Sequence, residues 1–324
     1  MKMISRRSHV LLGKSHRELC SHTSCSVMVL ASLGLLGSLL PESSWAQAPA
    51  QPKPSLSATA LPVLRGVVSG QAVVNAPAPG ASRSLLTIDQ ASQRAIIDWR
   101  SFNIGSDSEV LFRQPGSTAS TLNRIYDAAP SVIQGRLTSA GPVVDGKATP
   151  GGQVILINQN GILFDRGAQV NVQALVASSL NLTNERFLSG ALSSGGLETP
   201  AFAGGYDAQG MPLPTRPDGT QTGAIVLGAG GAANAAVPSL QANGGGSILL
   251  FAPTIDNKNG IIQAPDGQVM LAAGSKVYLA INQDPRDITL RGLVVEVEAA
   301  RGGPDLNLTS LIRNAGEIGA DRGN

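Results

Sequence analysis

The chain has 324 residues, a formal net charge of +2 and a hydrophobic fraction of 42%, with only 3% aromatic and 14% charged residues. Its basic residues are concentrated in the first 26 positions; from Gln47 onward 19 Lys and Arg face 20 Asp and Glu, so no nucleic-acid-binding surface is predicted. Both cysteines and all three histidines also precede residue 26, so removal of that segment would exclude Ser-His-Asp and Cys-His catalysis and imidazole or thiolate metal sites.

Residues 1–46 have the organisation of an extended signal peptide. A basic stretch of 26 residues precedes the apolar run from Val27 to Leu40, and small residues follow. The run has 14 residues, which is short for a membrane span of roughly 20 residues. We expect cleavage after Ala46, with an uncleaved N-terminal anchor as the alternative, and a Pro/Ala linker over residues 47–60.

Residues 61–190 contain short β-type runs separated by Gly, Asn, Asp and Pro, and we expect an N-terminal β cap followed by the first coils of a solenoid. Leu61–Val74 is rich in apolar residues and is the candidate for the cap that shields the first strand edge. Residues 90–99 fit a helix or a strand equally well. Residues 191–246 are rich in glycine and are predicted to be insertion loops, with a strand at Ala224–Leu227.

A repeated frame of one glycine, one polar residue and a short apolar run predicts the fold. Gly152 opens GQVILI, Gly246 opens GSILLF, and Gly267 opens GQVMLA 21 residues after Gly246. A second echo pairs residues 259–264 with residues 315–320. Short strands recurring at this interval predict an all-β, parallel β-helix with stacked coils. Continuous apolar runs suit strands covered on both faces, whereas the alternative, a β-sandwich, favours alternating ones.

From Ser247 the strand pattern resumes, and residues 247–324 are expected to form further coils. The final residues, from Ile312 onward, fit the middle of a coil rather than a closing cap. An unprotected end coil would expose strand edges. We therefore expect that the chain is a truncated part of a longer protein.

Several blocks of the sequence resemble segments of one protein family and occur in the same order as in that family. They are IDWRSFNIGSDSEVLFRQPGSTASTLNRI (Ile97–Ile125), PSVIQGRL (Pro130–Leu137), GGQVILINQNGILFDRGAQVNVQALVASSL (Gly151–Leu180), FLSG (Phe187–Gly190) and the segment Gly244–Leu279. These blocks resemble the N-terminal secretion domain of filamentous haemagglutinin-type exoproteins, the passengers of bacterial two-partner secretion. The resemblance covers roughly residues 62–324, interrupted by the glycine-rich stretch.

The family's hallmark is an NPNGI-like segment, which here reads Asn158-Gln159-Asn160-Gly161-Ile162 with Gln159 in place of proline. A second hallmark, NPNL, is absent. The resemblance implies that Asn158, Asn160, Gly161 and Ile162 matter for secretion and transporter recognition. The residues themselves indicate a coil corner, because Asn side chains bond to neighbouring backbone and Gly161 can complete a tight turn. Both interpretations stay open, and they are compatible.

The resemblance further implies a right-handed parallel β-helix with extra-helical β elements and an outer-membrane transporter as partner. It implies a secreted or cell-surface adhesin or haemagglutinin-like protein of a Gram-negative bacterium, with a host-cell or glycan receptor. The alternatives are the export domain of a contact-dependent toxin or haemolysin, and a secreted polysaccharide-acting β-helix enzyme. We expect no enzyme, no cofactor and no metal site.

The enzyme alternative would need two carboxylates a few ångströms apart, about 5–9.5 Å according to mechanism. The nearest group to such a cluster is Asp256, Asp266, Asp284 and Asp287, of which the last three have turn or loop surroundings. An ordinary turn role is favoured for them.

Single residues give weaker signals. Trp99 is expected in the core or cap, and Arg124 and Arg136 are expected to pair with nearby carboxylates or carbonyls. Triplets at Asn181 and Asn307 match the glycosylation pattern. Asn181 is expected to form a coil corner instead.

Overall fold

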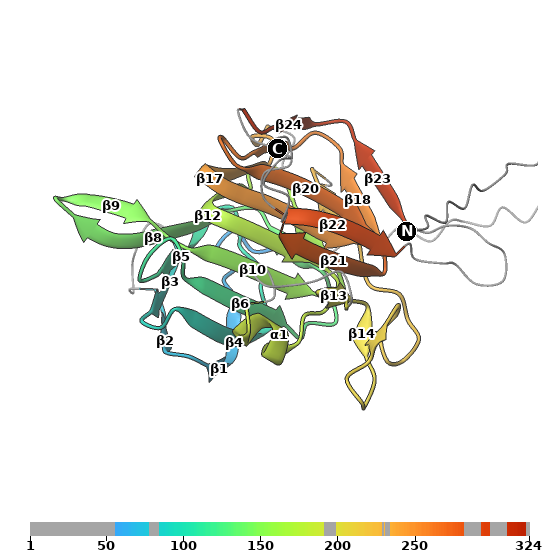
Figure 1. Ribbon diagram of the computed structural model, residues 1–324. Helices are drawn as coiled ribbons and strands as arrows, with labels where there is room; N and C mark the ends of the chain where they lie inside the picture. The colour runs from blue at the N-terminus through green and yellow to red at the C-terminus, as the bar shows by residue number, and fades with distance from the viewer. Residues whose placement is uncertain are drawn as a thin grey trace, which may run out of the picture. The chain divides into compact units, whose positions relative to one another are not determined.

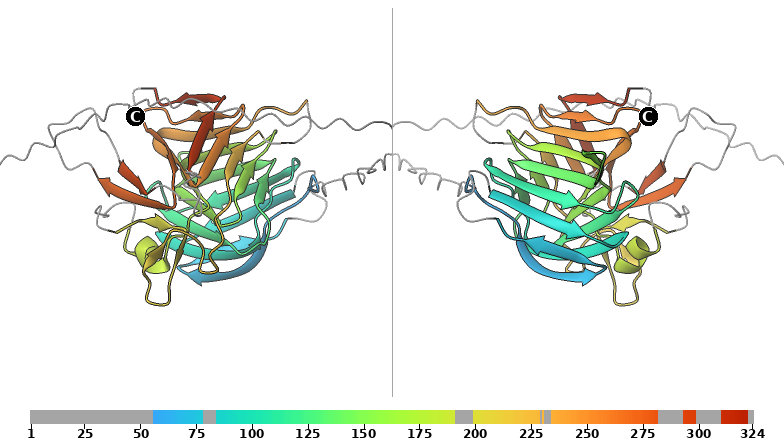
Figure 2. Two further views of the ribbon diagram at one scale, coloured as in Figure 1. Left: turned by 90° about the vertical axis from the view of Figure 1, so that its right-hand side faces the viewer. Right: turned by 90° about the vertical axis from the view of Figure 1, so that its left-hand side faces the viewer.

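The computed structural model describes residues 56–77, 84–190, 199–228, 230, 234–281, 293–298 and 310–321. The predicted leader with its cleavage residue Ala46, most of the linker, and Asp284, Asp287 and Asn307 lie outside these ranges. Within them, strands stack as successive coils of a parallel β-helix, as Figures 1 and 2 show. The expected fold class is confirmed.

The first face of the coil is a ladder of parallel strands in which each strand pairs with its counterpart in the next coil. The register brings Leu86, Val110 and Leu137 into one row that points into the core. In stacking order the strands of this face are β3 (Ser84–Gln90), β5 (Ser108–Arg113), β8 (Arg136–Val144), the first part of β12 (Gln169–Ser178), the first part of β17 (Ser239–Ala252), β19 (Ile261–Gln263) and β24 (Glu317–Gly319).

The second face follows the first in each coil and is also parallel. Its strands are β4 (Arg94–Ser101), β6 (Ser120–Ile125), β10 (Gln153–Asn158), the second parts of β12 and β17, and β20 (Gln268–Ala273). Residues 90–99, which fit a helix or a strand from sequence, therefore mostly belong to strand β4. The two halves of β12 and β17 join the first and second faces into one continuous sheet.

The third face is a separate five-stranded parallel sheet. Its strands are β7 (Ser131–Ile133), β11 (Ile162–Phe164), β16 (Ile225–Leu227), β18 (Thr254–Asn257) and β23 (Leu311–Asn314). Strand β16 corresponds to the strand expected at Ala224–Leu227.

Strand β17 begins at Ser239, eight residues before the expected resumption at Ser247. Ala242 pairs with Val172 and Ser247 pairs with Ala174, so residues 243–246 bulge opposite the single residue Gln173. The glycine-rich run therefore forms a bulge inside a strand, because glycines can bend the backbone without ending its pairing. Local composition had pointed to a loop.

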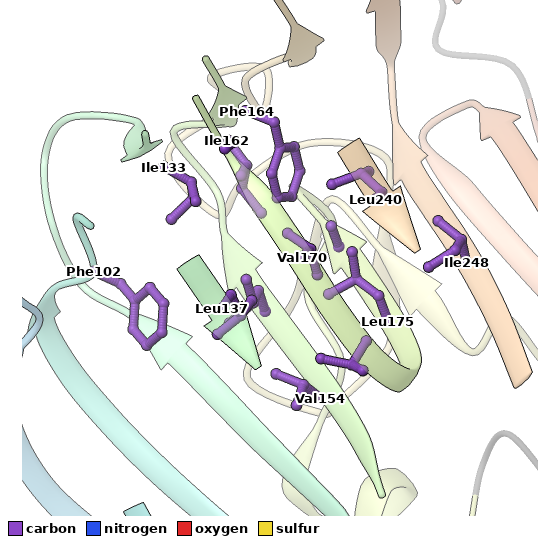
Figure 3. Close-up of a cluster of buried hydrophobic side chains, with 14 of the residues drawn as sticks. Phe102, Ile133, Leu137, Val154, Ile162, Phe164, Val170, Leu175, Leu240 and Ile248 are labelled. Atoms are coloured by element: carbon purple, nitrogen blue, oxygen red, sulfur yellow. The ribbon is translucent and has the colours of Figure 1, made fainter. Parts of the chain in front are cut away.

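Two hydrophobic cores explain the continuous apolar strands. Val154 and Leu156 of β10 point into the core enclosed by the three faces, where Figure 3 shows their neighbours interleaved. Ile155 and Ile157 point the other way, into a second core. That core is closed from outside by the sheet of β13 (Phe202–Ala203), β21 (Lys276–Ile281) and β22 (Leu293–Glu298). Each fully buried aliphatic side chain contributes about 1.5–3 kcal/mol, so both sides of the second face stabilise the coil.

Other elements also leave the coils. They are the hairpin of β8 with β9 (Lys147–Pro150), which projects from the coils in Figure 1, the short helix α1 (Asn184–Leu188), and β14 (Gly205–Tyr206) paired with β15 (Pro212–Leu213). These correspond to the expected extra-helical elements. Among the described residues, no helix has the length and apolar character needed to cross a bilayer.

The N-terminal segment caps the first coil on two sides. Strand β1 (Val63–Ser69) pairs antiparallel with β4, and β2 (Ala72–Asn75) pairs antiparallel with β3. Just before the cap, the N–H groups of Gly105 and Asp107 donate to the carbonyls of Ala60 and Ala58, at 2.9 and 2.8 Å. The cap thus pairs with Thr87–Gln90 of β3 and Ile96–Ser101 of β4 and shields most of the edge of these first strands, as the predicted cap requires.

The glycines of the repeated frame stack in one column. Gln153, Ala174, Ser247 and Gln268 share a register position on the second face, so Gly152, Gly246 and Gly267 occupy equivalent places before it. A methyl group on any of the three would collide with a backbone carbonyl oxygen of the preceding coil. Only glycine permits this spacing between coils.

This column predicts that Gly246→Ala destabilises the chain while Gly244→Ala does not. The new methyl group of Gly246→Ala meets the Gln173 carbonyl oxygen, whereas a methyl group at Gly244 meets nothing within 4 Å. Urea unfolding of the purified chain should show a loss of about 1–3 kcal/mol for Gly246→Ala. Equal stability of the two variants would contradict the close-packing explanation.

Candidate functional site

The segment Asn158–Ile162 forms the corner between the second and third faces of one coil. Asn158 is the last residue of β10, and Ile162 is the first residue of β11. Gly161 has a φ of 106°, and its N–H donates to the Asn158 carbonyl at 2.9 Å. A side chain at Gly161 would also collide with the Ala224 carbonyl, so both conformation and space require glycine here.

The Asn158 side chain is completely buried and fully bonded. Its Nδ2 donates to the Ala129 carbonyl at 3.1 Å and to Ser131 Oγ at 3.0 Å. Its Oδ1 accepts the Asn160 N–H at 2.9 Å. One amide group therefore holds the turn of its own coil and ties it to the preceding coil.

Asn160 makes a second connection between the same two coils. Its Nδ2 donates to the Asp127 carbonyl at 2.6 Å. Ile162 is completely buried in the central core. The structure thus brings all four predicted motif residues together at one corner, where they connect two coils and the core.

Gln159 connects the corner to a segment far along the chain. We call residues 199–224 the strap, because this segment runs across the corner before the chain enters β16. Gln159 Nε2 donates to the Gly204 carbonyl at 2.6 Å, and the Gln159 carbonyl accepts the Gly223 N–H at 2.8 Å. The guanidinium of Arg216 donates to the same carbonyl. The strap therefore covers the corner.

Within the strap, Tyr206 is held in a mostly buried position. Burial raises the pKa of Tyr206 to about 12, against the opposing effect of Arg186 and Arg124. Its hydroxyl donates to the Asn181 carbonyl at 3.4 Å. The strap is thus packed against the coils as well as bonded to them.

A second copy of the motif, which sequence reasoning missed, is Asn257-Lys258-Asn259-Gly260-Ile261. Asn257 is also completely buried, and its Oδ1 accepts the Gly260 N–H at 2.7 Å. Its Nδ2 donates to Asn314 Oδ1 at 2.8 Å, one coil further along. Comparison of the first motif with the rest of the sequence would have found it. This copy joins the third face to the first, so the five-residue pattern builds corners of more than one kind.

The carboxylates weighed for hydrolysis do not form a site in the described part of the chain. Asp256 lies on β18, in register with Arg313 of β23. Asp266 has a φ of 53° in the turn between β19 and β20. Asp284 and Asp287 lie outside the described residues. Within the described ranges, no three His, Cys, Asp or Glu side chains gather as a metal site would require.

The remaining expectations concern single side chains. Trp99 is completely buried, and its Nε1 donates to Asn123 Oδ1 at 3.0 Å, which confirms a core role. Arg124 donates to the Leu182 carbonyl at 2.6 Å, and Arg136 lies 3.7 Å from a Glu109 carboxylate oxygen, which confirms local pairing. Asn181 bridges to Ala203 beyond the end of β12, so the expected coil corner at Asn181 is wrong; it starts an excursion from the coil.

Comparisons with known proteins identify relatives of this chain. The sequence model described as "TPS secretion domain" matches residues 65–319. A heme/hemopexin-binding protein of Haemophilus influenzae is 40% identical over 97 residues, 30% of this chain and 9% of that protein. Another, from H. influenzae strain KW20 / Rd, is 36% identical over 126 residues, 39% of this chain and 12% of that protein. The aligned region thus spans about a tenth of the length of these curated relatives.

A solved structure supports the fold. The crystal structure of the HMW1 secretion domain from H. influenzae superposes with a TM-score of 0.55 at 24% identity, covering 80% of this chain and 53% of that one. At this identity the likeness concerns the fold. Both structures therefore share the β-helix architecture.

The corner geometry predicts that Asn158→Ala destabilises the chain by about 3 kcal/mol, because it leaves buried backbone groups without partners. Asn171→Ala, on the exposed side of β12, is the matched control and should be neutral. Urea unfolding measures both. An Asn158→Ala variant as stable as the control would show that the corner does not depend on this amide.

Proposed function

Because the chain belongs to the TPS secretion-domain family, we propose that it is the N-terminal export domain of a large exoprotein of a Gram-negative bacterium, recognised by an outer-membrane transporter partner. The observation that carries the proposal is the position of the family motif at a buried corner that joins two coils. Export follows removal of residues 1–46 after Ala46, and the product is secreted or held at the cell surface.

The cap and the coils supply a physical mechanism for export. Before folding, the chain offers unpaired strand edges, which periplasmic domains of a transporter can capture by adding a strand. Outside the cell, the capped first coil templates the next coil, and each coil formed disfavours return through the pore. At the far end, Leu311, Ile312 and Ile318 are 38–44% exposed, as a surface that further coils would cover.

Asn158, Asn160, Gly161 and Ile162 serve export by building the corner between the second and third faces of one coil and tying it to the preceding coil. The buried positions of Asn158, Gly161 and Ile162 and the partly buried position of Asn160 favour a role in folding over a role as an exposed address on the folded domain. Residues 61–190 then form the nucleus, residues 191–246 mainly add excursions, and residues 247–324 extend the solenoid. This division follows the stacking order of the strands.

The remainder of the exoprotein determines what it contacts. An adhesin or haemagglutinin-like protein with a host-cell or glycan receptor fits a surface-exposed solenoid, and a toxin or haemolysin using the same export domain is the alternative. The two relatives are described as binding heme and hemopexin, but they align over about a tenth of their length. Residues 47–324 contain no His or Cys, the commonest axial ligands of heme, so heme binding is not proposed for this domain.

Secretion of the 324-residue chain in a two-membrane bacterium tests this function. With the transporter present, a species beginning near Gln47 should be released, and Asn158→Ala plus Asn160→Ala should abolish its release. Asn171→Ala should be released like the unaltered chain. Release without any transporter would contradict the two-partner mechanism.

A further inference from the structure

We infer that the strap, residues 199–224, is a lid latched onto the motif corner by Gln159 and Arg216, and that its docking ends the corner's availability to the transporter. This inference rests on the proposed function and names two positioning residues for it. The latch joins segments 45 and 57 residues apart in sequence.

The latch has three hydrogen bonds centred on one residue. The Gln159 side chain donates to the Gly204 carbonyl at 2.6 Å. Its carbonyl accepts from the Gly223 N–H at 2.8 Å and from the Arg216 guanidinium. Proline at this position, as in the family motif, would have no side-chain donor, so this chain's departure from the motif creates one of the three bonds.

The contact between strap and corner is too close for side chains. A methyl group on Gly223 would collide with the Asn160 carbonyl, and a methyl group on Gly161 would collide with the Ala224 carbonyl. The strap is also held near its C-terminal end, where the hydroxyl of Thr222 lies 3.4 Å from the hydroxyl of Ser179, directly after β12. This backbone-to-backbone contact is specific to the docked position.

Docking occupies the groups that an added strand would use. The Gln159 carbonyl accepts from Gly223 and Arg216 of the strap, and the Ile162 N–H donates to the Ala224 carbonyl at 3.0 Å, where the strap leads into the ladder of β11 with β16. Strap and partner strand therefore compete for the same backbone atoms at this edge. Capture of the corner and docking of the strap exclude each other.

The order of the chain creates an interval between the two events. The strap begins 37 residues after the corner, so the corner passes any point on the export path before the strap does. During that interval the corner of the third coil is uncovered. Closing of the latch is then the step at which this region leaves the transporter and becomes part of the folded domain.

The first measurement is hydrogen–deuterium exchange of the purified secreted chain. Gln159→Ala combined with Arg216→Ala should speed exchange in peptides from the strap about tenfold, because loss of the latch favours local opening. Peptides from β4 and β6 should be unchanged. Gln209→Ala, at the exposed turn of the strap, is the matched control. Arg216→Lys keeps a cationic donor at this position, so its strap should exchange as slowly as that of the unaltered chain. Unchanged strap exchange in the double variant would overturn the latch.

The second measurement is binding of the purified transporter in detergent to each chain. The urea-unfolded chain, diluted at once into transporter, should bind; the folded chain should bind at least tenfold more weakly. The folded double variant should bind the transporter more tightly than the folded unaltered chain, with an affinity closer to that of the unfolded chain. Folded Gln209→Ala should bind as weakly as the folded unaltered chain. Gln159→Pro, which carries the family residue, serves as a second variant if the double variant misfolds.

The outcomes separate the two proposals. If unfolded and folded chains bind equally, or if the double variant opens the strap without gaining affinity, the lid inference is wrong while transporter recognition stands. If the unfolded chain does not bind at all, the proposed function itself fails.

Discussion

The close stacking of coils is the constraint on which the rest of this structure depends. Parallel strands in neighbouring coils lie about 4.8 Å apart, so every corner must pass its backbone beside another without side chains in between. Gly152, Gly246 and Gly267 meet this demand before the second face. Asn158 and Asn257 meet it at other corners, where one buried amide satisfies several backbone or side-chain groups. The motif that we propose to serve export is thus also a solution to a packing problem.

The segments that leave the coils cover parts of the coils that would otherwise be exposed to solvent. Because the second face is apolar on both sides, the outward row of Ile155 and Ile157 requires a cover, and β13, β21 and β22 supply it. The strap covers the corner after β10 in the same way. Folding of the domain therefore includes stacking of coils and closing of covers, and the covers come from later parts of the chain.

Sequence patterns predicted the features that repeat. The frame at Gly152, Gly246 and Gly267 predicted stacked strands, and these segments share one register position. The motif predicted a corner with Asn158, Asn160 and Gly161 at the turn. The pattern did not reveal the strap, because the contacts of Gln159 with Gly204 and Arg216 join distant segments that share no periodicity. It also placed residues 239–246 in a loop, since the bulge opposite Gln173 depends on the neighbouring strand.

If the motif serves export by building the coil, the secretion of each variant should depend on the stability of its folded domain. Secreted amounts of Asn158→Ala, Gly246→Ala and milder substitutions at both positions, plotted against their unfolding free energies, test this most directly. All variants should follow one relation between secretion and stability, because Gly246 lies far from the motif in sequence yet supports the same stack of coils. Variants of Asn158 that lose secretion while Gly246 variants of equal stability are secreted normally would contradict it.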